Sequence, residues 1–258
     1  MKQSVVLVEK RNRVATVTLN RPESLNALNR ELRATFVSRM LELRDDQEVS
    51  VIIVTGAGRA FCAGLDLKEL STASLRELSN VRFISVIDEI AVPMIAAVNG
   101  YAITGGLELA LACDLIVAAE GARFADTHAR VGVMPGGGMS VRLPRAVGIR
   151  KAKELSLTGN FLSAEDALEL GMVNRVVPKD QLMVVAHELA AQISSADQNV
   201  VRQMKRLINR TSLTTAGNGL RLEQDFFRGF SRSDHPRDFE KRRLEVQARG
   251  RQQGASKP

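Results

Sequence analysis

The apolar positions in the first fifty residues follow two different periods. Two β-rich runs at 5–8 and 14–19 flank the polar residues 9–13, which predicts an opening hairpin. Further along, apolar side chains recur at steps of three and four residues: Leu28, Leu32, Phe36, Met40 and Leu43. This spacing predicts an amphipathic helix over about 28–45.

Three short apolar runs follow in the middle of the chain. Residues 51–54, 94–98 and 115–119 are continuously apolar, as is typical of strands buried on both faces. Helical segments are expected near 74–91 and 105–113, where they separate these runs. The alternation indicates a mixed α/β fold built from stacked units of strands and helices.

The last third of the chain is predicted to be largely helical. Ser163 and Gly171 bound a short capped helix, and a strand is expected at 172–177. No strand pattern follows Pro178, and three or four helices are expected over 179–248.

Breaks between these helices are predicted near 194–197, 216–219 and 231–236, and residues 251–258 are expected to fray. We therefore divide the chain into a core of residues 1–195 and a C-terminal helical region of residues 196–258.

Composition and charge narrow the class of protein. Basic side chains outnumber acidic ones by 36 to 29 among 258 residues, a net charge of +7. No zinc-ligand spacing, RNA-recognition motif or aromatic stacking surface accompanies this charge, so a nucleic-acid partner is not expected. Cys62 and Cys113 are too few for a disulfide scaffold and indicate a reducing, cytoplasmic setting. The uncharged stretch 90–107 is interrupted by Pro93 and several glycines, which argues against a membrane span.

Two glycine-bearing turns carry the candidate chemistry. They span 59–67 and 99–109, and each follows an apolar run. Turns of this kind can direct two backbone N–H groups at one point, as an oxyanion hole requires. Glu108 stands three residues after Gly105, so its carboxylate is expected close to any group that these amides hold.

Other catalytic motifs fail at specific positions. Phe61 breaks the dinucleotide-binding pattern that starts at Gly56, and Leu107 stands where a phosphate-binding loop needs Ser or Thr. The chain has no nucleophile elbow of a serine hydrolase. Cys62 is more typical of a small buried residue than of a nucleophile. Because no metal-ligand spacing is present either, we expect no metal, nicotinamide or flavin.

Several segments together resemble the crotonase superfamily, the enoyl-CoA hydratase/isomerase group. They occur in the family's order at 20–28, 61–67, 99–114, 124–138, 142–148 and 157–178. The resemblance implies a spiral of strand–strand–helix units that forms two near-perpendicular sheets. It also implies C-terminal helices that assemble a homotrimer, or a hexamer made of two trimers.

The resemblance implies roles for individual residues as well. The backbone N–H groups of Leu65 and Gly105 would bind the thioester oxygen of an acyl-CoA, and Glu108 would hold and deprotonate the attacking water. The second glutamate of a standard hydratase is His128 here. This histidine is either a replacement acid and base, oriented by Asp126, or a packing residue in a protein that has lost hydration.

Coenzyme A is expected, from the same resemblance, to lie along residues 24–27 and 63–67. The residues expected to bind it are Ser24, Asn26, Ala27, Ala63, Leu65, Asp66, Leu67, Lys68 and Lys241. Arg21, Lys68 and Lys241 are the expected ligands of its phosphates. Residues 70–83 are expected to line the acyl pocket.

The activity that the resemblance implies is addition of water to trans-2-enoyl-CoA, giving 3-hydroxyacyl-CoA through a thioester enolate. Coenzyme A would enter as part of the substrate, with no separate cofactor. Because His128 departs from the hydratase pattern, two alternatives stay open. One is another acyl-CoA enolate reaction, such as isomerisation, decarboxylation or retro-aldol cleavage, and the other is a non-catalytic acyl-CoA-binding protein.

Overall fold

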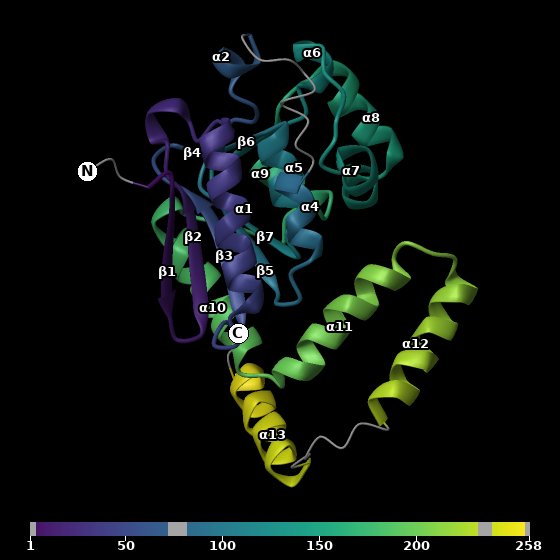
Figure 1. Cartoon of the computed structure of the whole chain (residues 1–258). Helices are drawn as coiled ribbons and strands as arrows, with labels where there is room; N and C mark the ends of the chain where they lie inside the picture. Colours follow the sequence, from purple (N-terminus) through teal and green to yellow (C-terminus); the bar gives the residue numbers. More distant parts are fainter. Residues whose placement is uncertain (1–3, 72–81, 232–238, 256–258) are drawn as a thin grey trace. The chain divides into compact units, whose positions relative to one another are not determined.

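A computed structural model describes residues 4–71, 82–231 and 239–255 (Figure 1). Its contacts divide the chain into two compact units, Met1–Arg206 and Leu207–Pro258. The division falls inside helix α11 (Gln198–Thr211), whereas the boundary drawn from the sequence lies after residue 195. Each unit is described by itself.

The first unit contains a six-stranded sheet. Its strands, in spatial order, are β1 (Val6–Arg11), β2 (Val14–Leu19), β3 (Val51–Gly56), β5 (Met94–Val98), β7 (Leu115–Ala119) and β10 (Arg175–Val177). β1 and β2 pair antiparallel, which confirms the predicted hairpin, and the other neighbours pair parallel. The predicted strand 172–177 begins only at residue 175, because the N–H groups of Met172 and Val173 donate to the carbonyl of Ala167 and close a helix end.

A second sheet has four shorter strands, in the spatial order β4 (Ala60–Cys62), β6 (Tyr101–Ile103), β8 (Arg123–Ala125) and β9 (Leu162–Ser163). β4, β6 and β8 run parallel, and β9 is antiparallel to β8. Along the chain, β3, β5 and β7 are followed in turn by β4, β6 and β8. Each repeat therefore adds one strand to each sheet, which is the predicted spiral of strand–strand–helix units.

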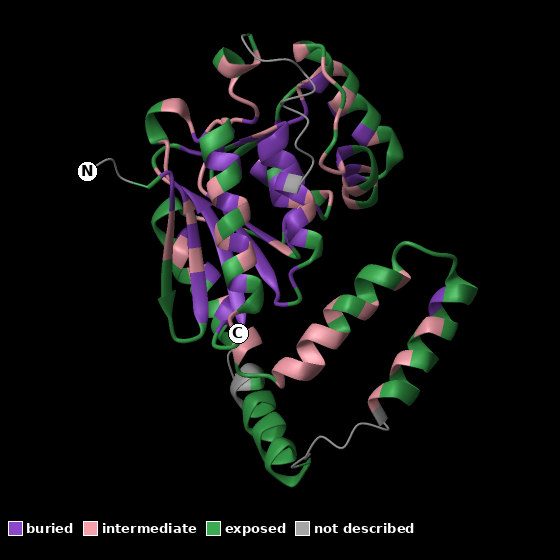
Figure 2. Ribbon diagram, in the orientation of Figure 1, coloured by how far each residue is buried: buried purple, intermediate pink, exposed green. Residues whose placement is uncertain are grey.

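The larger sheet is covered on both faces (Figure 2). Val51 and Ile53 of β3 belong to one apolar cluster with helix α10 (Leu182–Ser194), while Ile52 and Val54 point into the main core. Side chains alternate between the two faces of a strand, so a strand covered on both faces must be apolar throughout. This explains the continuous apolar runs in the sequence.

Helix α1 (Arg30–Asp45) confirms the predicted amphipathic helix. It begins after Asn29, whose side chain accepts a hydrogen bond from the N–H of Leu32 at 2.9 Å, as an N-cap residue does. Its apolar stripe, formed by Leu32, Phe36, Met40 and Leu43, is buried. Burying a side chain of this size contributes about 1.5–3 kcal/mol, so the stripe anchors the helix on the core.

The first unit has further helical segments, most of which pack against one another or against the smaller sheet. They are η1 (Pro22–Ser24), α2 (Leu67–Leu70), α4 (Arg82–Asp88), α5 (Gly105–Ala112), α6 (His128–Val131), α7 (Met139–Val147), α8 (Ile149–Thr158), α9 (Ala164–Glu169) and η2 (Lys179–Gln181). Ser163 caps α9 as predicted, since its side chain accepts from the N–H of Asp166. Of the helix predicted at 74–91, α4 is the described part, and residues 72–81 lie outside the described residues.

The second unit consists of the end of α11, α12 (Ala216–Ser231) and α13 (Phe239–Ala255). The break predicted near 216–219 lies at 212–215 instead, because Thr215 caps the start of α12: its hydroxyl and carbonyl accept from the N–H groups of Asn218 and Gly219. Residues 251–255 are helical, so fraying over this part is also wrong. Every described helix falls short of the length or hydropathy needed to cross a membrane.

Candidate active site

The turn after β4 and the turn after β6 lie against each other. Gly64 has a φ of +87°, and a Cβ atom there would lie 2.8 Å from the carbonyl oxygen of Ile103 and 3.5 Å from the nitrogen of Gly105. Glycine is therefore required at position 64 by both its conformation and its surroundings. The carbonyl of Gly64 also accepts from the N–H of Leu28 at 2.7 Å, which holds the turn in place.

These contacts bring together the two segments predicted to carry the backbone donors. Leu65 directly follows Gly64, and Gly105 is the first residue of α5, where N–H groups have no acceptor within the helix. Neither N–H group donates to a backbone carbonyl among the described residues. Both amides are thus available to an oxygen atom placed between the turns.

Thr104 sets the direction of the Gly105 amide. Its backbone has a φ of +53° and a ψ of −109°, a conformation that costs free energy for a β-branched residue. Three contacts hold it: its N–H donates to the carbonyl of Ala125 at 2.8 Å, its hydroxyl accepts from the N–H of Thr127 at 3.1 Å, and the two threonine hydroxyls lie 2.5 Å apart. No pattern in the sequence predicted this role.

The carboxylate of Glu108 is anchored at one oxygen. Glu108 is buried on α5, and its Oε1 accepts from the N–H of Gly137 at 2.8 Å and from that of Met139 at 3.3 Å. The other oxygen, Oε2, lies 3.9 Å from Nε2 of His128. The prediction from sequence missed both N–H partners, although the resemblance included the glycine-rich run that contains Gly137.

His128 lies between two carboxylates. Its Nδ1 is 2.6 Å from Oδ1 of Asp126, and its backbone N–H donates to the same oxygen at 3.2 Å. Burial raises the pKa of Asp126, but hydrogen bonds from His128 and Ser156 outweigh burial, so the pKa of this carboxyl is lowered. An ionised Asp126 accepts the hydrogen of Nδ1, which leaves Nε2 directed at Glu108.

The structure therefore aligns Glu108, His128 and Asp126 in one buried row, beside the two turns. All three were singled out from the sequence, and all three are at most 6% exposed. Such a row can pass a proton between Glu108 and a reacting group and can hold the imidazole in one tautomer.

The cysteines stay outside this chemistry. Cys62 and Cys113 are unpaired and buried, and burial raises the pKa of each thiol to about 12. A thiol of this kind carries no nucleophilic thiolate near neutral pH. Within the described ranges, no group of three or more His, Cys, Asp or Glu side chains is arranged to hold a metal ion.

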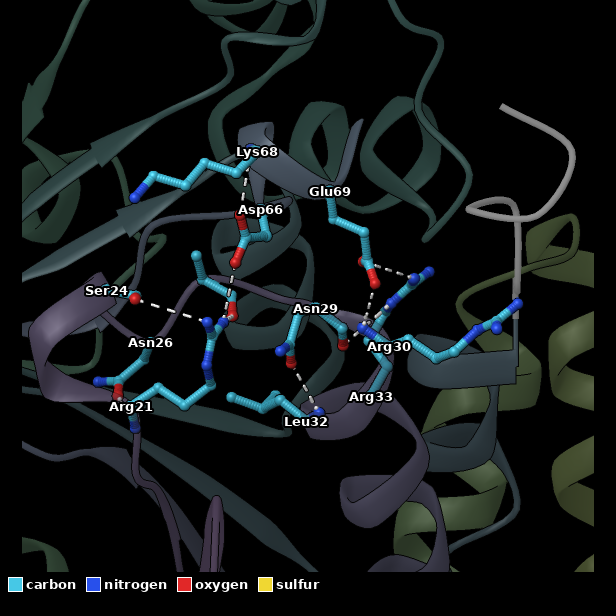
Figure 3. Close-up of polar contacts among 11 residues, drawn as sticks. Arg21, Ser24, Asn26, Asn29, Arg30, Leu32, Arg33, Asp66, Lys68 and Glu69 are labelled. Carbon is cyan, nitrogen blue, oxygen red and sulfur yellow. Dashed lines mark hydrogen bonds and ion pairs between the residues drawn. The ribbon is translucent and has the colours of Figure 1, made fainter. Parts of the chain in front are cut away.

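The two segments predicted to bind coenzyme A also lie side by side (Figure 3). Arg21 joins them: its Nη1 donates to the carbonyl of Ala27 at 2.6 Å and to Oδ2 of Asp66 at 3.0 Å. These contacts hold the two segments together, and the expected role of Arg21 as a phosphate ligand stays a prediction. Ser24 lies at the edge of this cluster, with its hydroxyl 3.5 Å from Nη2 of Arg21.

Asn26 has a similar internal role. Its side chain is fully buried, donates to the carbonyls of Ala57 and Ala60 at 3.0 and 2.8 Å, and accepts from the N–H of Arg21. Asn26 thus holds the loop together and is not exposed to a ligand. The N–H of Ala63 donates to the carbonyl of Leu25 at 3.0 Å, so the two segments are joined by backbone as well.

Asp66 starts the short helix α2. Its Oδ1 accepts from the N–H of Lys68 at 3.1 Å (Figure 3). Leu67 beside it is exposed. Lys241 belongs to α13 in the second unit, so its place near the site stays a prediction. Most of the segment expected to line the acyl pocket, 72–81, lies outside the described residues.

The sequence matches the family described as enoyl-CoA hydratase/isomerase over residues 9–246. It is 40% identical over 230 residues to a Mycobacterium tuberculosis protein named probable enoyl-CoA hydratase, with 88% of this chain and 90% of that protein covered. It is 37% identical to the short-chain-enoyl-CoA hydratase of Clostridium acetobutylicum, with 95% and 98% covered. The crystal structure of an enoyl-CoA hydratase from Bacillus anthracis superposes with a TM-score of 0.84 at 34% identity, over 89% of this chain and 92% of its own.

Proposed function

Because the chain belongs to the enoyl-CoA hydratase/isomerase family, we propose that it adds water to trans-2-enoyl-CoA thioesters to give 3-hydroxyacyl-CoA. The relatives named enoyl-CoA hydratase cover nearly the whole chain, which supports this reaction. The observation that carries it here is the 3.9 Å separation of Glu108 Oε2 and His128 Nε2, two proton carriers that face each other beside a pair of backbone donors.

In this proposal the amides of Leu65 and Gly105 bind the thioester oxygen. Attack of water at C3 moves the electron pair of the C2–C3 double bond toward the carbonyl, so negative charge gathers on that oxygen. Fixed N–H donors stabilise this enolate without reorganising, and the loss of one such donor typically costs about 10²–10³ in rate.

In this proposal Glu108 and His128 then carry out the proton transfers. Glu108 Oε2 takes a proton from water as the water oxygen bonds to C3. The carbonyl re-forms as C2 takes the Nε2 proton of His128. Transfer of the proton from Glu108 back to His128 restores both side chains, and the net change is the addition of one water.

Asp126 serves His128 as a positioning residue. Its carboxylate keeps the Nδ1 hydrogen in place and stabilises the imidazolium from which C2 is protonated. A glutamate at position 128 would need no such partner. The buried aspartate two residues earlier therefore favours an acid–base role for this histidine over a packing role.

Substrate binding and assembly complete the proposal. Coenzyme A would run along 24–27 and 63–67, with Lys68 and Lys241 near its phosphates and no further cofactor. The C-terminal helices expose large apolar side chains in the single chain, namely Leu220, Phe227, Phe239, Leu244 and Val246, which supports assembly into a homotrimer or hexamer. Two unpaired cysteines support a cytoplasmic enzyme.

One assay decides between this reaction and its alternatives. Purified protein is mixed with crotonyl-CoA and with longer and aromatic enoyl-CoAs, and loss of the conjugated enoyl-thioester absorbance is followed. Turnover that disappears in Glu108→Gln supports hydration. Tight binding of coenzyme A without turnover on any substrate favours a non-catalytic acyl-CoA-binding protein. Products other than 3-hydroxyacyl-CoA identify another enolate reaction.

A further inference from the structure

Arg142 on α7 makes a contact that leads directly to the buried carboxylate. Its Nη1 donates to the carbonyl oxygen of Gly137 at 2.7 Å, and its Nη2 lies 2.6 Å from Oδ1 of Asp88 at the end of α4. A guanidinium bound at two of its nitrogens has a rigid, planar geometry that an ammonium group cannot copy. The glycine carbonyl is therefore fixed in position between α7 and α4.

Gly137 connects the fixed position of its carbonyl to Glu108. While its carbonyl binds Arg142, its N–H donates to Oε1 of Glu108 at 2.8 Å. The residue between Gly137 and Met139 is Gly138, whose φ of +98° sets the turn. A Cβ atom at Gly138 would collide with Nη1 of Arg142, so turn and arginine fit each other closely.

The glycine turn is packed closely on the side that faces Glu108 and α4. A Cβ atom at Gly137 would lie 2.7 Å from Oε2 of Glu108 and 2.7 Å from Cγ1 of Ile84 on α4. α5 packs against both α4 and α7. The turn thus lies between α4 on one side and the carboxylate on the other.

We propose that Arg142 is a positioning residue for Glu108: by clamping Gly137 against α4, it keeps Oε1 bound to backbone amides and directs Oε2 at His128. The proposal rests on the proposed function, in which Oε2 is the atom that takes the proton from water. Without the clamp, the Gly137 amide shifts and the carboxylate rotates away from its reactive orientation.

The expected effect is on chemistry rather than on substrate binding. Displacement of a catalytic group by about 1 Å can cost about 10²-fold in rate, so Arg142→Ala should lower kcat by about 10- to 100-fold. Arg142 is not among the residues that hold the segments 24–27 and 63–67, so KM should stay within about twofold of the wild-type value.

The experiment compares kcat, KM and the midpoint of thermal unfolding for the full chain and four variants. Arg142→Ala removes the clamp, and Arg142→Lys keeps the charge without the planar fork, so most of the loss in kcat should remain. Asp88→Asn should give a smaller loss, because Arg142 keeps its bond to Gly137. Arg145→Ala is the matched control on the same helix. Among the described residues Arg145 donates to the carbonyl of Val141 in its own helix and to no atom of the site, so this variant should retain wild-type kcat.

Rescue separates positioning from general destabilisation. Millimolar guanidinium chloride should restore part of the kcat of Arg142→Ala and leave Arg145→Ala unchanged. A folded Arg142→Ala with kcat within twofold of wild type would overturn the proposal, as would a loss that appears equally in Arg145→Ala. If Arg142→Ala fails to fold, Arg142→Lys provides the same comparison.

The two proposals can fail separately. If the wild-type protein hydrates no enoyl-CoA, the proposed function fails, and the clamp is then tested by crystal structures of wild type and Arg142→Lys. The expected difference is loss of the hydrogen bond from Gly137 N–H to Glu108 Oε1 in the variant. An unchanged carboxylate in the variant would overturn the clamp, whatever the reaction.

Discussion

Nε2 of His128 lies 3.9 Å from Oε2 of Glu108, a separation too long for a direct hydrogen bond and short enough for both atoms to contact the same reacting group. Each of the two side chains is held from behind, Glu108 by the amides of Gly137 and Met139 and His128 by Asp126. The distance between Oε2 and Nε2 is therefore set by these outer contacts of the two side chains, and not by a hydrogen bond between them.

Glu108→Gln tests the base. The amide oxygen of glutamine can still accept from Gly137 and Met139, so the fold should be kept, but it cannot take a proton from water. General acid–base groups contribute about 10²–10⁴ in rate, so kcat for crotonyl-CoA should fall by this factor while KM changes little. Calorimetric titration with coenzyme A checks that binding is intact. A variant with more than a tenth of wild-type kcat would exclude Glu108 as the base.

His128→Ala and His128→Glu test the second proton carrier. Removal of the imidazole should reduce kcat by about 10²–10⁴, because nothing else in the row reaches C2. His128→Glu restores a carboxyl that can be protonated and should recover part of the rate. Steady-state kinetics of both variants are the measurement. Full activity in His128→Ala would make this residue a packing residue.

Asp126→Asn tests the tautomer and has a second effect on stability. Asparagine is neutral and can donate as well as accept, so Nδ1 is no longer required to carry the hydrogen, and kcat should fall at least about tenfold. Asp126 has a lowered pKa in the folded protein. Its contribution to stability is therefore full above the ordinary aspartate pKa of about 3.9 and is lost as pH falls through the folded value.

The unfolding midpoint of Asp126→Asn should accordingly depend less on pH than that of wild type, and the difference should lie below about pH 4. Thermal unfolding between pH 3 and pH 7 makes the comparison. Equal slopes for the two proteins in the acid range would contradict a charged Asp126 in the folded state.

Gly137→Ala tests the fit of the glycine turn against the base. The new methyl group would lie 2.7 Å from both Glu108 Oε2 and Ile84 Cγ1. Overpacking of this kind costs about 1–3 kcal/mol, and it pushes on the reactive oxygen, so both stability and kcat should fall. Gly136→Ala is the control, because its added methyl group would have no atom of the described residues within 4 Å apart from its own chain neighbours. Chemical denaturation and crotonyl-CoA kinetics of the pair should differ clearly, and matching results would contradict the close fit.

Periodicity in the sequence predicted the elements whose burial is decided locally. The helix over 28–45 and the apolar strands β3, β5 and β7 follow from spacing alone. The strands β4, β6 and β8 were missed because each has three residues and is set by parallel pairing with strands far along the chain. The misplaced break before α12 shows that a capping threonine, Thr215, outweighs two nearby glycines.

In the candidate site, too, some features could be predicted from the sequence and others could not. The resemblance named Glu108, His128 and Asp126, and they do lie together. It did not reveal which oxygen of Glu108 is anchored, nor the strained backbone of Thr104. Those features come from amides and carbonyls of other loops. They cannot be predicted from the identity of the side chain that they contact. The internal partners of Arg21 were missed for the same reason, because they are a distant carboxylate and a backbone carbonyl.

The pairing of β4 with β6 has a consequence for how far the molecule can vary. Leu65 and Gly105 each follow one of these adjacent parallel strands by a few residues. Adjacent strands lie about 4.8 Å apart, so the spacing of the two amides is a property of the ladder. Changes in chain length between the two turns that leave β5 and α4 in place would therefore not alter the binding of an acyl oxygen by these amides.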